Sequence, residues 1–211
     1  MARDIFVISD THFGHENILN FTQENGDKVR TFHDVHHMNE HMIENWNKTV
    51  SDSDIVYHLG DVFFGKGHEV LPRLKGRKRL LVGNHDNPKS EHILNHFQKV
   101  MLWREFAEFN CLMTHVPVHE SSLYKRNYNL HGHVHNGSHR GLLQDERYIN
   151  CCGRGGGMPS SNELPNGWMV RFSSSPMYNA EMKSIEYGIE PDVWVMLDAG
   201  DVEGGVDSLV S

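Results

Sequence analysis

Five short apolar runs in the chain each end at polar residues that can bind a metal ion. Those residues are Asp10 and His12, Asp61, Asn84, His115, and His133 with His135. Mixed carboxylate, amide-oxygen and imidazole ligands suit divalent Mn, Fe, Zn, Ni or Co. The sequence has three cysteines and no pair with CxxC spacing, which argues against a structural zinc cluster built from thiolates.

Ligands of these types suit the hydrolysis of a phosphate ester. That reaction needs a hydroxide nucleophile at neutral pH and compensation for the charge on the phosphoryl oxygens, and two metal ions about 3.5–4 Å apart supply both. A carboxylate can bridge two ions, and an imidazole that binds no metal can protonate the leaving alkoxide. The 17 histidines of the chain favour a site of this kind, because imidazole is both a ligand and a proton carrier near neutral pH.

The apolar runs predict strands that would bring these residues together. The runs cover residues 5–9, 55–59, 79–82, 111–114 and 128–131. Between them, apolar residues at helical spacing predict a helix from Val35 to Trp46 capped by Asp34, and shorter helices near residues 70–74 and 93–97. Alternating strands and helices indicate an α/β fold with a central mixed sheet. Ligands of such sheets bind beyond the carboxyl ends of the strands.

Five sequence blocks, SDTHFGHEN, YHLGDV, VGNHD, THVP and HGHVH, resemble in this order the motifs of the calcineurin-like metallophosphoesterase superfamily. The intervening sequence is similar to a bacterial and phage branch of small phosphoesterases, and the resemblance covers about residues 4–152. It implies a metallophosphoesterase-type layered αββα sandwich and two divalent metal ions, with Mn²⁺ first and Fe, Zn, Ni or Co as alternatives.

The resemblance also implies a role for each motif residue. Asp10, His12 and His135 would hold the first metal, and Asn84, His115 and His133 the second, with Asp61 as the bridge. His85 would donate the proton to the leaving group, and Asp86 would orient it. His15, Asn17 and Arg30 are candidate substrate contacts, although loop capping is an equal alternative for His15 and Asn17. We interpret His58, inside a predicted strand, as a core histidine.

The sequence changes character after residue 152. We predict a metallophosphoesterase domain at residues 1–152, followed at residues 153–211 by a Gly-rich linker and a small β-rich C-terminal appendage, with strands at 168–172 and 193–197. The appendage resembles part of the C-terminal-processing (S41-type) serine peptidases without the nucleophile region. We therefore expect no peptidase activity there, and homo-oligomer or partner contacts remain open.

Bulk composition limits the partners. The chain has 211 residues, a formal net charge of -8 and a pI near 6.1, so we expect no stable nucleic-acid partner and no membrane association. We interpret the three cysteines as reduced, and the sequence shows no leader pattern. Both observations favour a cytoplasmic protein. We predict a hydrolase acting on a small phosphate monoester or diester, nucleotide-like or otherwise. Alternatives are a metal-loaded scaffold module acting through its tail and a Mn-dependent nuclease.

Overall fold

Two sheets form the framework of the computed structural model. It describes residues 4–22, 28–123, 125–135, 145 and 147–152, and the backbone of 160–163 and 169–172. The first sheet has the order β4 (Lys99–Met101), β3 (Arg77–Leu81), β2 (Ile55–His58), β1 (Ile5–Ile8), β10 (Met169–Phe172) and β9 (Ser160–Glu163). The second has the order β5 (Trp103–Phe106), β6 (Cys111–Thr114), β7 (Tyr128–His131) and β8 (Tyr148–Asn150).

Parallel pairing determines where the loops meet. Strands β1, β2 and β3 run parallel, with Phe6 opposite Val56 and Val56 opposite Lys78. In the second sheet β6, β7 and β8 are also parallel. Within each set, the carboxyl ends therefore lie at one edge of the sheet, and the loops that follow these strands carry the predicted ligands.

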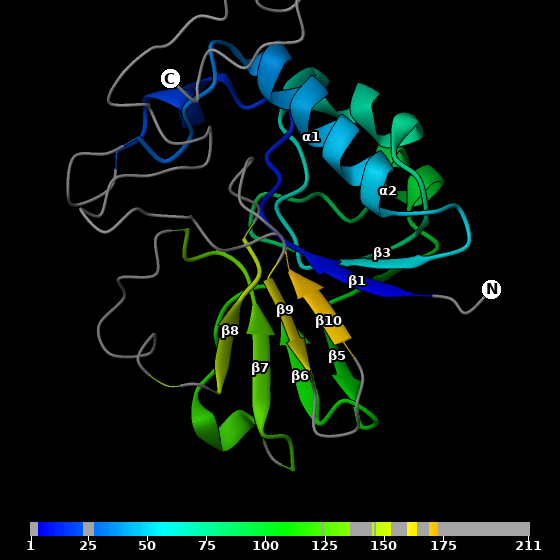
Figure 1. The fold of residues 1–211 in the computed structure, drawn as a ribbon, viewed down its shortest axis with the longest axis vertical. Helices are drawn as coiled ribbons and strands as arrows, with labels where there is room; N and C mark the ends of the chain where they lie inside the picture. Colours follow the sequence, from blue (N-terminus) through cyan, green and yellow to red (C-terminus); the bar gives the residue numbers. More distant parts are fainter. Residues whose placement is uncertain are drawn as a thin grey trace, which may run out of the picture.

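Helices cover one face of the first sheet (Figure 1). They are α1 (Val35–Thr49) and α2 (Glu91–His96), with the 3-10 helices η1 (Glu16–Asn20), η2 (Gly65–Arg73) and η3 (Glu120–Ser122) elsewhere in the chain. The predicted cap of α1 is confirmed, since Asp34 accepts a hydrogen bond from the backbone N–H of His37 at 2.7 Å. The helix predicted near residue 70 is the 3-10 helix η2, which includes Pro72.

Two apolar cores separate three layers. Met38, Met42 and Trp46 of α1 pack with Val56 and Leu80 of the first sheet. On the opposite face of that sheet, alternate residues pack against the second sheet, as side chains of a strand must. This inner core contains Val7, Tyr57, Leu81, Phe106, Met113 and Leu130. The layered α/β sandwich is confirmed, and Figure 1 shows the second sheet on the side away from α1. Of the αββα layers that the family resemblance implies, the described residues show one helical layer and both sheets, with the three-residue η3 beside the second sheet.

Two segments of the predicted appendage form strands of the first sheet. Strand β10 pairs parallel with β1, with Phe172 opposite Val7, and antiparallel with β9. The predicted strand at 168–172 thus corresponds to β10, while the one at 193–197 lies outside the described residues. The domain boundary at residue 152 stays a prediction.

His58 is a satisfied core histidine, as predicted. It is 1% exposed; its Nδ1 accepts from the backbone N–H of Gly60 at 3.2 Å, so its Nε2 donates to the Thr11 hydroxyl at 2.9 Å. The Thr11 hydroxyl donates onward to the Val62 carbonyl at 2.8 Å. This series of hydrogen bonds requires the neutral imidazole, and burial lowers the pKa of His58 to about 4.

Protonation of His58 should therefore destabilise the fold. Between the unfolded pKa of about 6.5 and the folded pKa of about 4, the unfolded state binds more protons than the folded state. The free energy of unfolding is therefore highest above pH 6.5 and decreases as the pH is lowered towards 4. At pH 5 the expected loss is roughly 2 kcal/mol relative to pH 7.5. Urea unfolding of metal-free protein at both values measures it. His58→Gln should show a pH dependence smaller by that amount, and an identical dependence would contradict the assignment.

Candidate metal centre

The loops after five strands converge at the carboxyl ends of the sheets. The first loop is tied to the second by hydrogen bonds from the backbone N–H of Asp10 to Gly60 O at 2.9 Å and from that of His12 to Asp61 O at 3.1 Å. In the second sheet, Gly132 N–H donates to His115 O at 2.7 Å. These bonds hold side chains from distant parts of the chain at one place.

One group of donor atoms consists of Asp10 Oδ1, His12 Nε2 and His135 Nε2. The two imidazole nitrogens are 3.1 Å apart, and each lies 3.6 Å from the Asp10 oxygen. Ligands about 2.0–2.2 Å from one ion, at angles near 90–110°, lie roughly 3.0–3.5 Å from one another. The three donors therefore have the spacing of ligands to a single divalent ion.

A second group lies around His115. Its Nδ1 faces the Leu59 carbonyl oxygen at 2.7 Å and must carry the proton, because a carbonyl only accepts. The lone pair of Nε2 then faces Asn84 Oδ1 at 2.8 Å and Asp61 Oδ2 at 3.6 Å. Three acceptors that face one another suit a shared cation. His133 belongs to this group too, since ligand atoms of Asp61, His115 and His133 all lie within 4.8 Å of one another.

Asp61 links the two groups. Ligand atoms of Asp10, His12 and Asp61 also lie within 4.8 Å of one another, so Asp61 faces both sets of donors. It is 2% exposed, and its Oδ1 accepts from the backbone N–H of His85 at 2.9 Å. This is the position that a bridging carboxylate requires.

The Asp10 carboxylate is oriented by three donors to one of its oxygens. Oδ2 accepts from the Ser9 hydroxyl at 2.5 Å, from the backbone N–H of His133 at 2.9 Å and from the Cys152 thiol at 3.2 Å. Oδ1 is buried without a hydrogen-bond partner and faces the imidazoles. A buried, unsatisfied carboxylate oxygen is costly unless a cation meets it. A Cβ at Gly132 would lie 1.9 Å from Ser9 Oγ, so this arrangement requires glycine there.

Electrostatics keep Asp10 ionised. Burial by itself would raise the pKa of Asp10, but the nearby imidazoles of His12 and His135 and the hydrogen bond from the Ser9 hydroxyl together hold that pKa well below its ordinary value. An ionised carboxylate is the form that ligates a divalent ion.

Several of the predicted ligand residues adopt left-handed backbone conformations. Asp10, His12, Asp61 and His133 have φ values of 54°, 49°, 57° and 67°. Residues other than glycine adopt such angles rarely and at a cost of order 1–3 kcal/mol. Strain concentrated on residues of one cluster is typical of functional sites, where the surrounding structure holds it in place.

Comparison with known proteins agrees with this geometry. The profile of the calcineurin-like phosphoesterases matches residues 4–202. The chain belongs to the calcineurin-like phosphoesterase family. The match extends past residue 152 and gives no support to the resemblance of the tail to peptidases.

Several relatives of this family member are similar over part of their length. The uncharacterized protein MJ1445 of Methanocaldococcus jannaschii is 34% identical over 138 residues, which are 63% of this chain and 70% of MJ1445. The Gene 66 protein of Mycobacterium phage D29 is 34% identical over 91 residues, 40% of this chain and 41% of the phage protein. The crystal structure of AQ665 from Aquifex aeolicus, a protein of unknown function, has a TM-score of 0.58 at 26% identity, covering 72% of this chain and 91% of AQ665.

The Asp86 carboxylate binds backbone N–H groups. It accepts from the N–H groups of Asp61 at 2.8 Å, Val62 at 2.9 Å and Gly83 at 2.8 Å. It thereby fixes the loop of Asp61 against the loop of Asn84 and His85. Direct orientation of the His85 ring by Asp86 stays a prediction.

Phe64 is a site residue that the motifs did not reveal. Its ring stacks on His12 with centroids 5.3 Å apart and lies 4.3 Å from the ring of His15 and 5.0 Å from that of His85. The exposed His85 is thus held near the first donor group, with its ring 6.3 Å from that of His12. Only its place shortly after the GDV of the second motif could have suggested Phe64.

The predicted substrate contacts differ in their surroundings. His15 caps η1, since its Nδ1 accepts from the backbone N–H of Ile18 at 2.9 Å, and Asn17 is exposed in the same helix. Arg30 is 2% exposed and donates to the carbonyl oxygens of Asp10 at 2.6 Å and Thr11 at 2.7 Å. In this structure the Arg30 guanidinium thus holds the backbone of the loop that carries Asp10, and a substrate contact by Arg30 stays a prediction.

No helix in the described part of the chain combines the length and apolar character needed to cross a membrane.

Proposed function

We propose that this phosphoesterase is a dinuclear enzyme that hydrolyses small phosphate monoesters or diesters, with Mn²⁺ as the first candidate metal. The observation that carries the proposal is the pair of donor groups that share Asp61. Asp10, His12 and His135 would hold one ion, and Asn84, His115 and His133 the other. Two divalent ions bound there would lower the pKa of water to yield hydroxide and would offset charge on the phosphoryl oxygens.

Side chains of the protein would position the ligands and protonate the leaving group. Asp61 and Asp10 keep their positions because backbone N–H groups hold one oxygen of each carboxylate. The exposed imidazole of His85, beside the donor groups, would protonate the leaving oxygen. Asp86, bound to three backbone N–H groups, would keep the loops of Asp61 and His85 in register during the reaction.

Removal and return of metal test the proposal. Protein treated with EDTA should lose hydrolysis of p-nitrophenyl phosphate and bis-p-nitrophenyl phosphate, and added Mn²⁺ should restore it, because no side chain of the site replaces the ions. Elemental analysis of the active protein should find two ions per chain. Activity that survives complete metal removal would contradict the proposal, as would full metal loading without turnover of any phosphate ester, including single-stranded DNA.

A further inference from the structure

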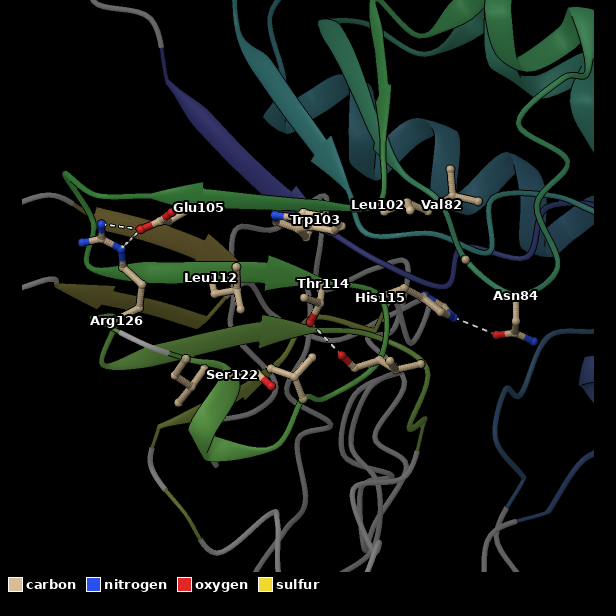
Figure 2. Close-up of a pocket in the computed structure, with 14 residues that line it drawn as sticks. Val82, Asn84, Leu102, Trp103, Glu105, Leu112, Thr114, His115, Ser122 and Arg126 are labelled. Atoms are coloured by element: carbon tan, nitrogen blue, oxygen red, sulfur yellow. Dashed lines mark hydrogen bonds and ion pairs between the residues drawn. The ribbon is translucent and has the colours of Figure 1, made fainter.

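A groove runs from the second donor group across the outer face of the second sheet (Figure 2). Its volume is about 630 Å³, within the range of small-molecule sites. Asn84 and His115 line one end. Leu102 and Trp103 form one wall, and Leu112 and Thr114 of β6 form the floor. A ligand whose phosphate sits between the donor groups could therefore extend into this groove.

Among the residues that the structure describes, little covers this face of the sheet. Cys111 and Met113 of β6 face the inner core, so Leu112 and Thr114 face outward. Among the described residues, the helix beside them is the three-residue η3, and its Ser122 lines the wall opposite Trp103.

Large apolar side chains are exposed along the groove. Trp103 is 63% exposed, Leu102 66% and Val116 43%. They make up three of the five large hydrophobic residues that are exposed in the described part of the chain. Exposed apolar surface gathered around a cavity is typical of a ligand site.

The groove carries little net charge away from its metal end. Its charged side chains are Glu105 and Arg126, and they pair with each other: Arg126 Nε donates to Glu105 Oε1 at 2.7 Å. Arg126 is therefore engaged by a carboxylate and does not offer its charge to a phosphate. An uncharged occupant fits this surface better than a second phosphate or an acidic peptide.

We propose that this groove binds the leaving group of the substrate, and that this leaving group carries a planar heteroaromatic ring, as in a nucleoside. The inference rests on the proposed function. An exposed indole favours a flat ring through stacking. The Ser122 hydroxyl on the opposite wall offers a hydrogen bond to a polar ring edge, which an aliphatic chain would not use.

The test compares two substrates with the same leaving alkoxide. Adenosine 5′-monophosphate and ribose 5-phosphate differ by the base, and each is also supplied as its methyl diester. With Mn²⁺-loaded protein, kcat/KM should be about tenfold higher for the adenosine compound. Trp103→Ala should make the two values converge, whereas Trp103→Phe should keep most of the difference. Leu94→Ala, which alters an exposed leucine of α2 outside the groove, should change neither value.

Binding of free adenosine provides a readout that needs no turnover. Metal-loaded wild-type protein should show fluorescence quenching by adenosine that Trp103→Ala lacks. If no phosphate ester is hydrolysed, the proposed function fails. The quenching measurement then decides by itself whether the groove binds adenosine. Equal kcat/KM for both sugar phosphates, together with no quenching that depends on Trp103, would overturn the groove proposal even if nitrophenyl esters are hydrolysed. A dimer that Trp103→Ala dissociates would also overturn it, since a second copy would then occupy the groove.

Discussion

Replacing Asp61 with asparagine should lower kcat/KM for phosphate esters about 10³-fold and reduce the metal content from two ions towards one. The amide has nearly the shape of the carboxylate and keeps an oxygen that can accept from His85 N–H, as Oδ1 does now at 2.9 Å. It loses the negative charge that faces both donor groups. A loss of several kcal/mol of transition-state stabilisation corresponds to this factor. Steady-state kinetics and elemental analysis of the same sample measure both effects.

Asp52→Asn is the matched control for Asp61→Asn. Asp52 is an exposed carboxylate in a surface turn, so its replacement removes the same charge from the chain without reaching the donor groups. Activity and metal content should stay at the wild-type level. If Asp61→Asn kept two ions and full activity while its thermal unfolding remained normal, the bridging role of Asp61 would be wrong.

His85→Ala should lower kcat about 10²–10³-fold for substrates with an alkoxide leaving group, the usual effect of losing a general acid. The fold and the metal content should not change, because the His85 side chain is exposed and the hydrogen bond from His85 to Asp61 comes from its backbone N–H. Nitrophenolate leaves without protonation, so the loss for nitrophenyl esters should be much smaller. Comparing ribose 5-phosphate with p-nitrophenyl phosphate separates the two cases.

The control for His85→Ala is His36→Ala, which removes an exposed imidazole from α1 and should leave kcat for both substrates unchanged. An equal loss with both leaving groups would indicate that His85 binds the phosphoryl group and does not donate a proton. Loss of a metal ion in His85→Ala would make it a ligand, contrary to the role that the family resemblance implies.

The local pattern of the sequence was sufficient for the strands that carry the ligands and for α1. Short apolar runs of four or five residues that end at a polar residue are typical of buried parallel strands. The start of α1 is marked by Asp34, whose side chain accepts a hydrogen bond from the backbone N–H three residues later. Strands β4, β5, β8 and β9 were not predicted. Lys99–Met101 and Trp103–Phe106 are short and partly polar, and they form strands through pairing with partners elsewhere in the chain.

For the metal centre, the order of the motifs determined which residues to consider, because ligand chemistry depends on residue type. Tertiary structure decided what each neighbour does. The sequence suggested Arg30 as a phosphate contact, whereas in the structure its guanidinium is buried, contacts Met38 Sδ and donates to the Asp10 carbonyl oxygen.

By itself, the sequence determined the layered α/β fold and the set of candidate donor residues, since both follow from local patterns and residue type. The left-handed backbone at Asp10, His12, Asp61 and His133, the three donors on Asp10 Oδ2, and the apolar groove beside Asn84 and His115 were decided by the tertiary structure. These features depend on contacts between residues far apart in the chain, which no local pattern records.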